Sequence, residues 1–129
     1  VAGIISPWNY PLILTVSPMV EALLAGNTVV LKPSEQTPLT TELLKKVWDE
    51  STEKPELFQA VYGAEEVGNE LVTSCHTDVI CFTGSTSVGR KIAEACAPLF
   101  KPVILELGGK DPMIILEDAN IIMLYKILK

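Results

Sequence analysis

The chain has 129 residues, a length that suits one domain. Hydrophobic residues make up 48% and charged residues 20%, which excludes a disordered segment, a collagen-like repeat and a disulfide-framework miniprotein. Ten basic against 16 acidic side chains give a formal charge of −6, which argues against nucleic acid and anionic membranes as partners.

The three cysteines, Cys75, Cys81 and Cys96, have no CxxC spacing and indicate reduced thiols in a cytoplasmic protein. The longest apolar stretch, 12–25, contains a proline and a glutamate and is shorter than the ~20 residues of a membrane span. No charged segment precedes a cleavable apolar run, so no signal peptide is predicted. Because the sequence begins without Met and inside a predicted strand, we expect a truncated piece of a longer protein.

The first half of the chain alternates between strand and helix signals. A short apolar strand is predicted at 1–6 and a helix at 12–25, which ends at a Gly-Asn pair. A β-branched strand follows at 28–31. The next helix is predicted from Pro38 to Asp49, with Thr37 as its N-cap.

The second half repeats this alternation. Strands are predicted at 57–62, 78–82, 103–105 and 113–116, and helices at 65–74 and 90–96. The strands are continuous apolar runs, which is typical of a parallel sheet covered on both faces. We therefore predict one α/β domain with a Rossmann-like open, mostly parallel sheet and helices on both faces.

Ligands of an open parallel sheet bind beyond the carboxyl ends of its strands, so the loops after the strands are the candidate site. The first of these loops, 6–11, holds two prolines that make it stiff. A stiff loop can aim the Asn9 amide at a developing oxyanion. The alternative is that Asn9 is a turn residue and Trp8 a packing residue.

The second loop begins with Lys32 at the end of a buried strand, three residues before Glu35. An ammonium and a carboxylate in this arrangement can hold a nucleotide ribose, and the carboxylate repels a 2′-phosphate. The alternative is a solvated pair beside a helix start.

The third loop contains Gly84 and Gly89 and leads into a helix, an arrangement that lets backbone amides approach a phosphate. The GxGxxG pattern is absent, and the P-loop pattern fails because Arg90 occupies the Lys position and Ile92, rather than Ser or Thr, follows Lys91. A phosphate site and a plain helix-capping loop remain equally supported.

The fourth loop follows a short apolar strand that ends in Glu106. A poorly solvated carboxylate there is a candidate general base, and Gly108 and Gly109 leave room for a ligand. The alternative is that Glu106 pairs with Lys110. His76 and the cysteines are interpreted as structural, and the chain offers too few ligands for a metal site.

Four stretches, in their order and spacing, resemble the aldehyde dehydrogenase superfamily over residues 1–120. They are Ser6-Pro7-Trp8-Asn9-Tyr10-Pro11, Lys32-Pro33-Ser34-Glu35, Phe82-Thr83-Gly84-Ser85-Thr86-Ser87-Val88-Gly89 and Leu105-Glu106-Leu107-Gly108-Gly109-Lys110. The resemblance implies oxidation of an aldehyde to a carboxylate with hydride transfer to NAD. It also implies an NAD-binding domain without the triple-glycine turn.

The resemblance assigns roles to residues in each stretch. Asn9 would stabilise a thiohemiacetal oxyanion, and Glu106 would activate the water that hydrolyses a thioester. Lys32 and Glu35 would hold the adenosine ribose and favour NAD over NADP. The implied cofactor-binding set is Ile5, Ser6, Pro7, Trp8, Lys32, Ser34, Glu35, Phe82, Thr83, Gly84, Ser85, Val88, Leu107 and Gly108.

One departure from the family concerns the nucleophile. The family's cysteine follows the Glu-Leu-Gly-Gly motif, whereas all three cysteines here precede Glu106. We therefore expect a partial NAD-binding domain at 1–120, a divergent tail at 121–129 (alternatively a short amphipathic helix), and no turnover by this chain alone. A non-catalytic nucleotide-binding remnant and a P-loop-like NTPase are the alternatives. The full-length parent is expected to be a homo-oligomer acting on a small aldehyde.

Overall fold

A computed structural model describes residues 1–127, and strands and helices alternate along this part of the chain. The strands are β1 (Ala2–Ile5), β2 (Val29–Lys32), β3 (Phe58–Ala60), β4 (Val79–Thr83) and β5 (Val103–Glu106). The α-helices are α1 (Ile13–Leu24), α2 (Pro38–Ser51), α3 (Glu65–Thr73), α4 (Thr86–Cys96) and α5 (Ile121–Ile127). Two 3₁₀ turns, Pro55–Leu57 and Ala97–Leu99, precede β3 and follow α4.

The strands described in residues 1–127 form one sheet in the order β3-β2-β1-β4-β5. All four pairings are parallel, with Ala2 opposite both Val29 and Val79. The direction of strand order reverses at β1, so β1 and β4 flank the position where open α/β sheets bind ligands. The predicted α/β Rossmann-like fold is confirmed.

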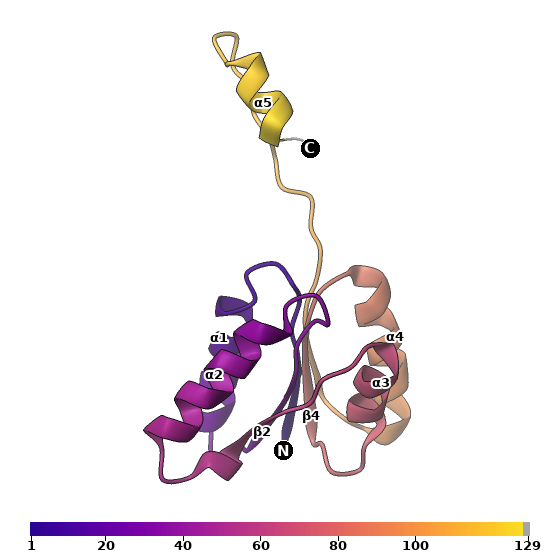
Figure 1. Ribbon diagram of the computed structural model, residues 1–129. Helices are drawn as coiled ribbons and strands as arrows, with labels where there is room; N and C mark the ends of the chain where they lie inside the picture. Colours follow the sequence, from indigo (N-terminus) through magenta and orange to yellow (C-terminus); the bar gives the residue numbers. More distant parts are fainter. Residues whose placement is uncertain (128–129) are drawn as a thin grey trace.

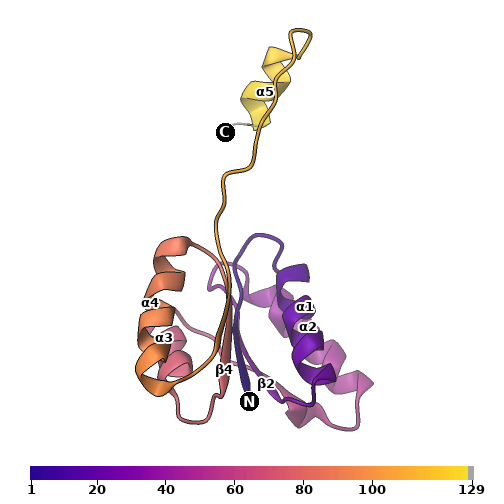
Figure 2. The same ribbon diagram turned by 180° about the vertical axis from the view of Figure 1, so that it is seen from behind.

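The two faces of the sheet carry separate cores. Figures 1 and 2 show α1 and α2 on one face and α3 and α4 on the other. Successive side chains of a strand point to opposite faces. Ile4 accordingly joins a core with Met19 and Phe58, whereas Ile5 packs on the opposite core around Ile80. The predicted covering of both faces therefore follows from strands that carry apolar side chains on both sides.

The strand predicted at 113–116 is wrong. These residues have no regular secondary structure, and they lie in a segment that projects from the sheet toward α5. An apolar run forms a strand only when a neighbour supplies its hydrogen bonds, and no described strand lies beside this one. The alternative reading of the tail as a short helix agrees with α5, whose Ile121 and Ile122 are exposed.

Two helix starts differ from the prediction. Helix α4 begins at Thr86 rather than at residue 90, because Ser85 caps it by accepting a hydrogen bond from the Val88 amide. Thr37 does precede α2, but its side chain makes no capping hydrogen bond, and its buried Oγ1 has no partner within residues 1–127. None of the described helices is both long and apolar enough to span a bilayer.

Candidate functional site

The candidate site lies at the edge of the sheet where the strands end. Because all pairings are parallel, the loops after β1, β2, β4 and β5 emerge at this edge, which is uppermost in Figure 1. Among the described residues, two pockets open along it, one on each face of the sheet.

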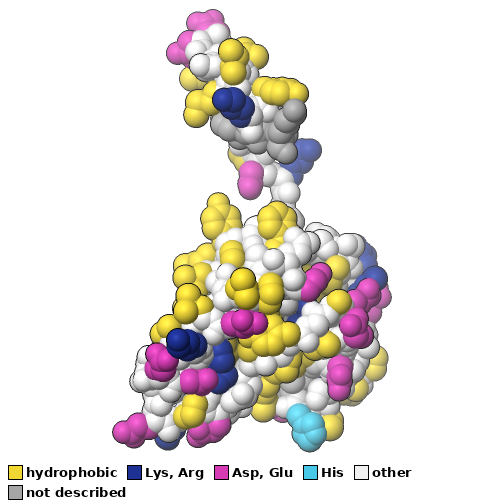
Figure 3. Space-filling view, viewed as in Figure 1, with side chains coloured by type: hydrophobic (Ala, Val, Ile, Leu, Met, Phe, Trp, Pro, Cys, Tyr) yellow, Lys and Arg dark blue, Asp and Glu magenta, His cyan; other side chains and the backbone are white. Residues whose placement is uncertain are grey.

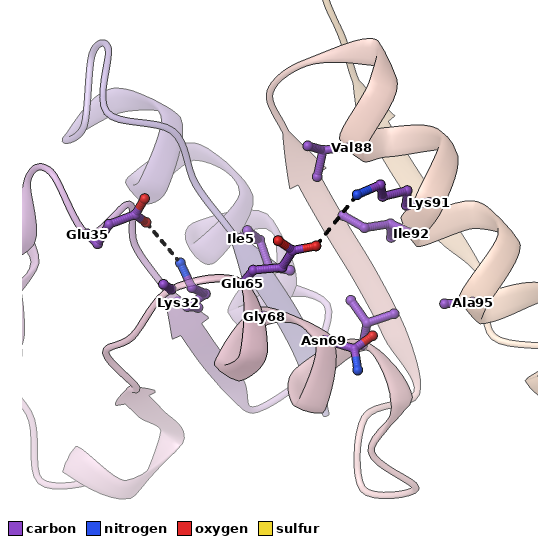
Figure 4. A pocket seen from close by; sticks show the side chains of 12 residues that line it. Ile5, Lys32, Glu35, Glu65, Gly68, Asn69, Val88, Lys91, Ile92 and Ala95 are labelled. Carbon is purple, nitrogen blue, oxygen red and sulfur yellow. Dashed lines mark ion pairs between the residues drawn. The ribbon is translucent and has the colours of Figure 1, made fainter.

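The first pocket, here the inter-helix pocket, lies between α3 and α4 and reaches the ends of β1 and β2 (Figure 4). Its volume is about 320 Å³. Its lining consists of Ile5, Lys32, Glu35, Ala64, Glu65, Gly68, Asn69, Val72, Val88, Lys91, Ile92 and Ala95. Four of these, Ile5, Lys32, Glu35 and Val88, belong to the predicted cofactor-binding set.

Lys32 and Glu35 are held together at one end of this pocket. The Lys32 side chain is only 7% exposed, and its Nζ donates to the Pro33 carbonyl oxygen at 3.0 Å. Its ion pair with Glu35 Oε2 spans 3.6 Å. These two contacts fix the lysine end in place at the pocket wall. The alternative of a solvated pair fails for Lys32 and holds only for the exposed Glu35.

The second pocket, here the α1-side pocket, lies on the opposite face and has a volume of about 750 Å³. It is lined by Pro7, Trp8, Asn9, Leu14, Ser17, Pro18, Glu21, Cys81, Thr83, Gly84, Ser85, Ile104, Glu106, Leu107 and Gly108. Asn9 and Glu106, the two predicted catalytic residues, therefore line the same pocket although they are far apart in sequence. Seven predicted cofactor-binding residues also line it, namely Pro7, Trp8, Thr83, Gly84, Ser85, Leu107 and Gly108.

Glu106 is exposed at the end of β5, so the expectation of a poorly solvated carboxylate is wrong. Ile104 and Glu106 share one side of β5, and that side is open in the described chain. The main chain at this point is anchored, because the Gly84 amide donates to the Glu106 carbonyl at 3.0 Å. No ion pair joins Glu106 to Lys110 within residues 1–127, so the alternative role of Glu106 is also not observed.

The start of α4 separates the two pockets, since Ser85 lines one and Val88 the other. The glycines here are explained by the chain's own packing. A Cβ at Gly84 would lie 2.5 Å from the Phe82 ring, and one at Gly89 would lie 2.4 Å from Leu107 Cδ2. Ser85 acts as a helix cap, the plainer of the two predicted roles. A Cβ at Gly109 would meet nothing within 4 Å, so this glycine does leave open space.

Three predicted cofactor-binding residues line neither pocket. Ser6 is buried, and its Oγ accepts a hydrogen bond from Thr15 at 2.8 Å. Phe82 is part of the core beneath α4. Ser34 Oγ accepts from the Gln36 amide at 3.3 Å and shapes the loop between Lys32 and Glu35.

Sequence reasoning missed the helical walls of the inter-helix pocket. Residues 65, 68 and 72 of α3 and 88, 91 and 95 of α4 follow helical spacing, so each set occupies one helix face. That periodicity was available in the sequence for α3, but the late start predicted for α4 left Val88 outside the predicted helix.

Cys81 and Glu21 were also missed as lining residues of the α1-side pocket. Burial, and then the Glu21 and Glu106 carboxylates, raise the pKa of the Cys81 thiol. This thiol is therefore protonated at neutral pH, and a protonated thiol is a poor nucleophile. No group of three His, Cys, Asp or Glu side chains among residues 1–127 is placed to hold a metal ion.

The sheet order and the polar loops at its carboxyl edge define a Rossmann-like α/β protein with its candidate site at the strand ends. The aldehyde dehydrogenase family model matches residues 1–127, and the chain belongs to this oxidoreductase family. The resemblance stated from the four loops is thereby confirmed.

Individual relatives agree with this family. The chain is 45% identical over 128 residues to a geranial dehydrogenase of Castellaniella defragrans, covering 99% of this chain and 27% of that protein. An aldehyde dehydrogenase structure from Bartonella henselae is 40% identical, with a TM-score of 0.84, covering 97% of this chain and 26% of that one. The structure of PnpE in complex with nicotinamide adenine dinucleotide is 43% identical, with a TM-score of 0.82, covering 92% and 25%. The chain thus spans about a quarter of the length of these relatives.

Proposed function

We propose that this chain is the cofactor-binding part of an oxidoreductase that oxidises an aldehyde to a carboxylate, with NAD as the hydride acceptor. The observation that carries the proposal is the pairing of two pockets along one edge of the sheet. One pocket holds the Lys32–Glu35 pair, and the other holds Asn9 and Glu106. An extended dinucleotide fits this arrangement, with one half on each side of the start of α4.

The adenosine half fits the inter-helix pocket. Lys32 Nζ is fixed by Pro33 and Glu35, and the Glu35 carboxylate is free on its exposed side to accept from ribose hydroxyls. The same carboxylate repels a phosphate on the ribose, which supports NAD over NADP. Ile5, Ser34 and Val88 complete this end, with Ser34 acting through the loop that it shapes.

The centre of the dinucleotide fits the turn between β4 and α4. The first amides of a helix have no intrahelical partner, and the helix dipole places partial positive charge there. Thr83, Gly84 and Ser85 present main-chain and hydroxyl groups at this position, over the buried Phe82 ring. The pyrophosphate would therefore cross the edge of the sheet at Ser85.

The α1-side pocket supplies the groups for chemistry. Asn9 carries amide donors for an oxyanion at the aldehyde carbonyl, and Glu106 carries a carboxylate that takes a proton from water. Ser6, Pro7 and Trp8 set the loop that presents Asn9, and Leu107 and Gly108 follow Glu106 along the same wall. Bound NAD would supply the hydride-accepting ring at this end.

The 129-residue chain itself is proposed to bind NAD without oxidising aldehydes. Its cysteines all precede Glu106, and Cys81, the one in the α1-side pocket, has a raised pKa. By itself, such a chain is a non-catalytic nucleotide-binding remnant. The nucleotide would bind within residues 1–120, the unit proposed as the NAD-binding domain. Location in the cytoplasm and assembly of the parent into a homo-oligomer stay predictions.

Titration with NAD tests the proposal directly. Trp8 lines the α1-side pocket and is 58% exposed, so its fluorescence should change on binding. Lys32→Ala should weaken NAD binding at least about tenfold, because a hydrogen bond from a charged group contributes about 1.5–3 kcal/mol. Lys46→Ala, an exposed lysine of α2, is the matched control and should leave the affinity unchanged. Equal affinities of the two variants would remove Lys32 from the site.

A further inference from the structure

The inter-helix pocket is a slot with a charged rim. Its two helical walls are mostly small or apolar, with Gly68 and Val72 on α3 facing Val88, Ile92 and Ala95 on α4. At its mouth, Glu65 Oε1 of α3 and Lys91 Nζ of α4 form an ion pair of 3.6 Å. Figure 4 shows this pair bridging the two helices.

The ion pair is available to a ligand. The Glu65 and Lys91 side chains are 87% and 71% exposed, and exposed ion pairs contribute little to folding stability. The carboxylate keeps free lone pairs and the ammonium keeps free N–H donors, so both can bind a third group without separating. The pair therefore offers an acceptor and a donor side by side.

We propose that Glu65 and Lys91 read the base of the bound dinucleotide and select adenine. This inference rests on the proposed function, in which the inter-helix pocket binds the adenosine half. Adenine presents an amino donor beside a ring-nitrogen acceptor on one edge. Glu65 accepts from the amino group and Lys91 donates to the ring nitrogen. A base with a carbonyl in place of the amino group would bring its oxygen against the Glu65 carboxylate.

The ribose pair directs the base into this slot. A Cβ at Gly68 would lie 3.6 Å from Lys32 Cδ, so the stem of Lys32 runs against α3 at that glycine. A ribose held at Lys32 and Glu35 thus lies beside the opening between the helices. The flat faces of its base then contact Val72, Val88 and Ile92, which leaves the polar edge for Glu65 and Lys91.

The test compares two ligands on the full 129-residue chain: NAD and its analogue with hypoxanthine in place of adenine. The unaltered chain should prefer NAD about fivefold or more, the lower end of what a two-point base contact provides. Glu65→Gln and Lys91→Met should each bring the ratio of the two dissociation constants below about twofold. Glu66→Gln, on the next residue of α3 and outside the pocket lining, is the matched control and should keep the full preference.

A charge-swap variant distinguishes recognition of the base by Glu65 and Lys91 from a purely structural role of their ion pair between α3 and α4. The double variant E65K/K91E keeps an ion pair between α3 and α4 but exchanges donor and acceptor, so it should favour the hypoxanthine analogue. If the ratio stays at its original value in Glu65→Gln and Lys91→Met, the base-reading role is overturned. The proposed function then still stands, provided Lys32→Ala weakens NAD binding. Absence of NAD binding by the unaltered chain would overturn both, and thermal melting confirms that each variant is folded.

Discussion

The two pockets differ in how firmly the described chain holds their side chains. In the inter-helix pocket, Lys32 is buried and fixed by two partners, and helices from both sides form the walls. In the α1-side pocket, Asn9 and Glu106 are exposed, and only α1 covers the sheet beside them. The groups proposed to bind nucleotide are therefore preorganised, whereas those proposed for chemistry are not.

This difference indicates that the groups proposed for binding and those proposed for chemistry lie in separable parts of the sheet edge. The inter-helix pocket depends on packing between α3, α4 and the sheet. The α1-side pocket depends on loops whose side chains are exposed to solvent. Changes to packing should accordingly affect the first pocket much more than the second.

The largest expected effect comes from two isoleucines on neighbouring strands. Ile80 is fully buried beneath the inter-helix pocket, whereas Ile104 lines the α1-side pocket and is 55% exposed. Ile80→Ala should lower the free energy of unfolding by about 2–5 kcal/mol, because it leaves a cavity. Ile104→Ala should lower it by about 0.5 kcal/mol or less. Urea denaturation measures both, and equal losses would remove the distinction between the pockets.

A smaller effect is expected from the anchor of α3. Lys101 Nζ donates to the Val72 carbonyl at 2.6 Å, to the Ser74 carbonyl at 2.8 Å and to Thr77 Oγ1 at 2.8 Å. Lys101→Met removes these bonds and should cost about 1–3 kcal/mol of stability.

Because α3 forms one wall of the inter-helix pocket, Lys101→Met should also weaken NAD binding severalfold. The exposed Lys110 provides the control, and Lys110→Met should change neither stability nor affinity. An NAD affinity that survives Lys101→Met unchanged would show that the wall does not need this anchor.

The smallest expected effect is an alkaline loss of stability through Cys81. Burial and the carboxylates of Glu21 and Glu106 raise the thiol pKa in the folded chain above its ordinary value of 9.0. As pH rises, the Cys81 thiol ionises first in the unfolded chain. The stability that the protonated thiol gives to the folded chain is therefore fully present below pH 9.0 and is lost as pH rises through the folded pKa.

Urea midpoints at neutral and alkaline pH measure this loss for the original chain and for Cys81→Ala. The variant should lose less on going to alkaline pH. Some loss should persist, because burial also raises the pKa of Cys96. Identical losses of stability in the original chain and in Cys81→Ala would mean that the Cys81 thiol remains in contact with water in the α1-side pocket.

The position of the site was predictable because it follows from strand direction. Once the apolar runs indicated a parallel sheet, Lys32 and Glu106 had to lie at its carboxyl edge. Sequence spacing also gave the Lys32–Glu35 contact, since residues in one tight loop stay close.

Features that depend on neighbours were not predictable from local sequence. The solvation of Glu106 depends on what covers β5, and a strand at 113–116 depends on a partner strand. Gly84 and Gly89 suggested a phosphate cradle, but contacts with Phe82 and Leu107 account for them. Likewise, packing rather than local sequence decides which face of α3 contacts which face of α4.

The position of β1 at the centre of the sheet has a consequence for synthesis on the ribosome. Ala2 pairs with Val29 on one side, but its other neighbour, Val79, is translated much later. Until β4 emerges, the nascent chain carries an open apolar strand edge, the kind of surface on which chains aggregate. Slow decoding before β4 would prolong this exposure, so chaperone capture should be strongest on nascent chains stalled within α3.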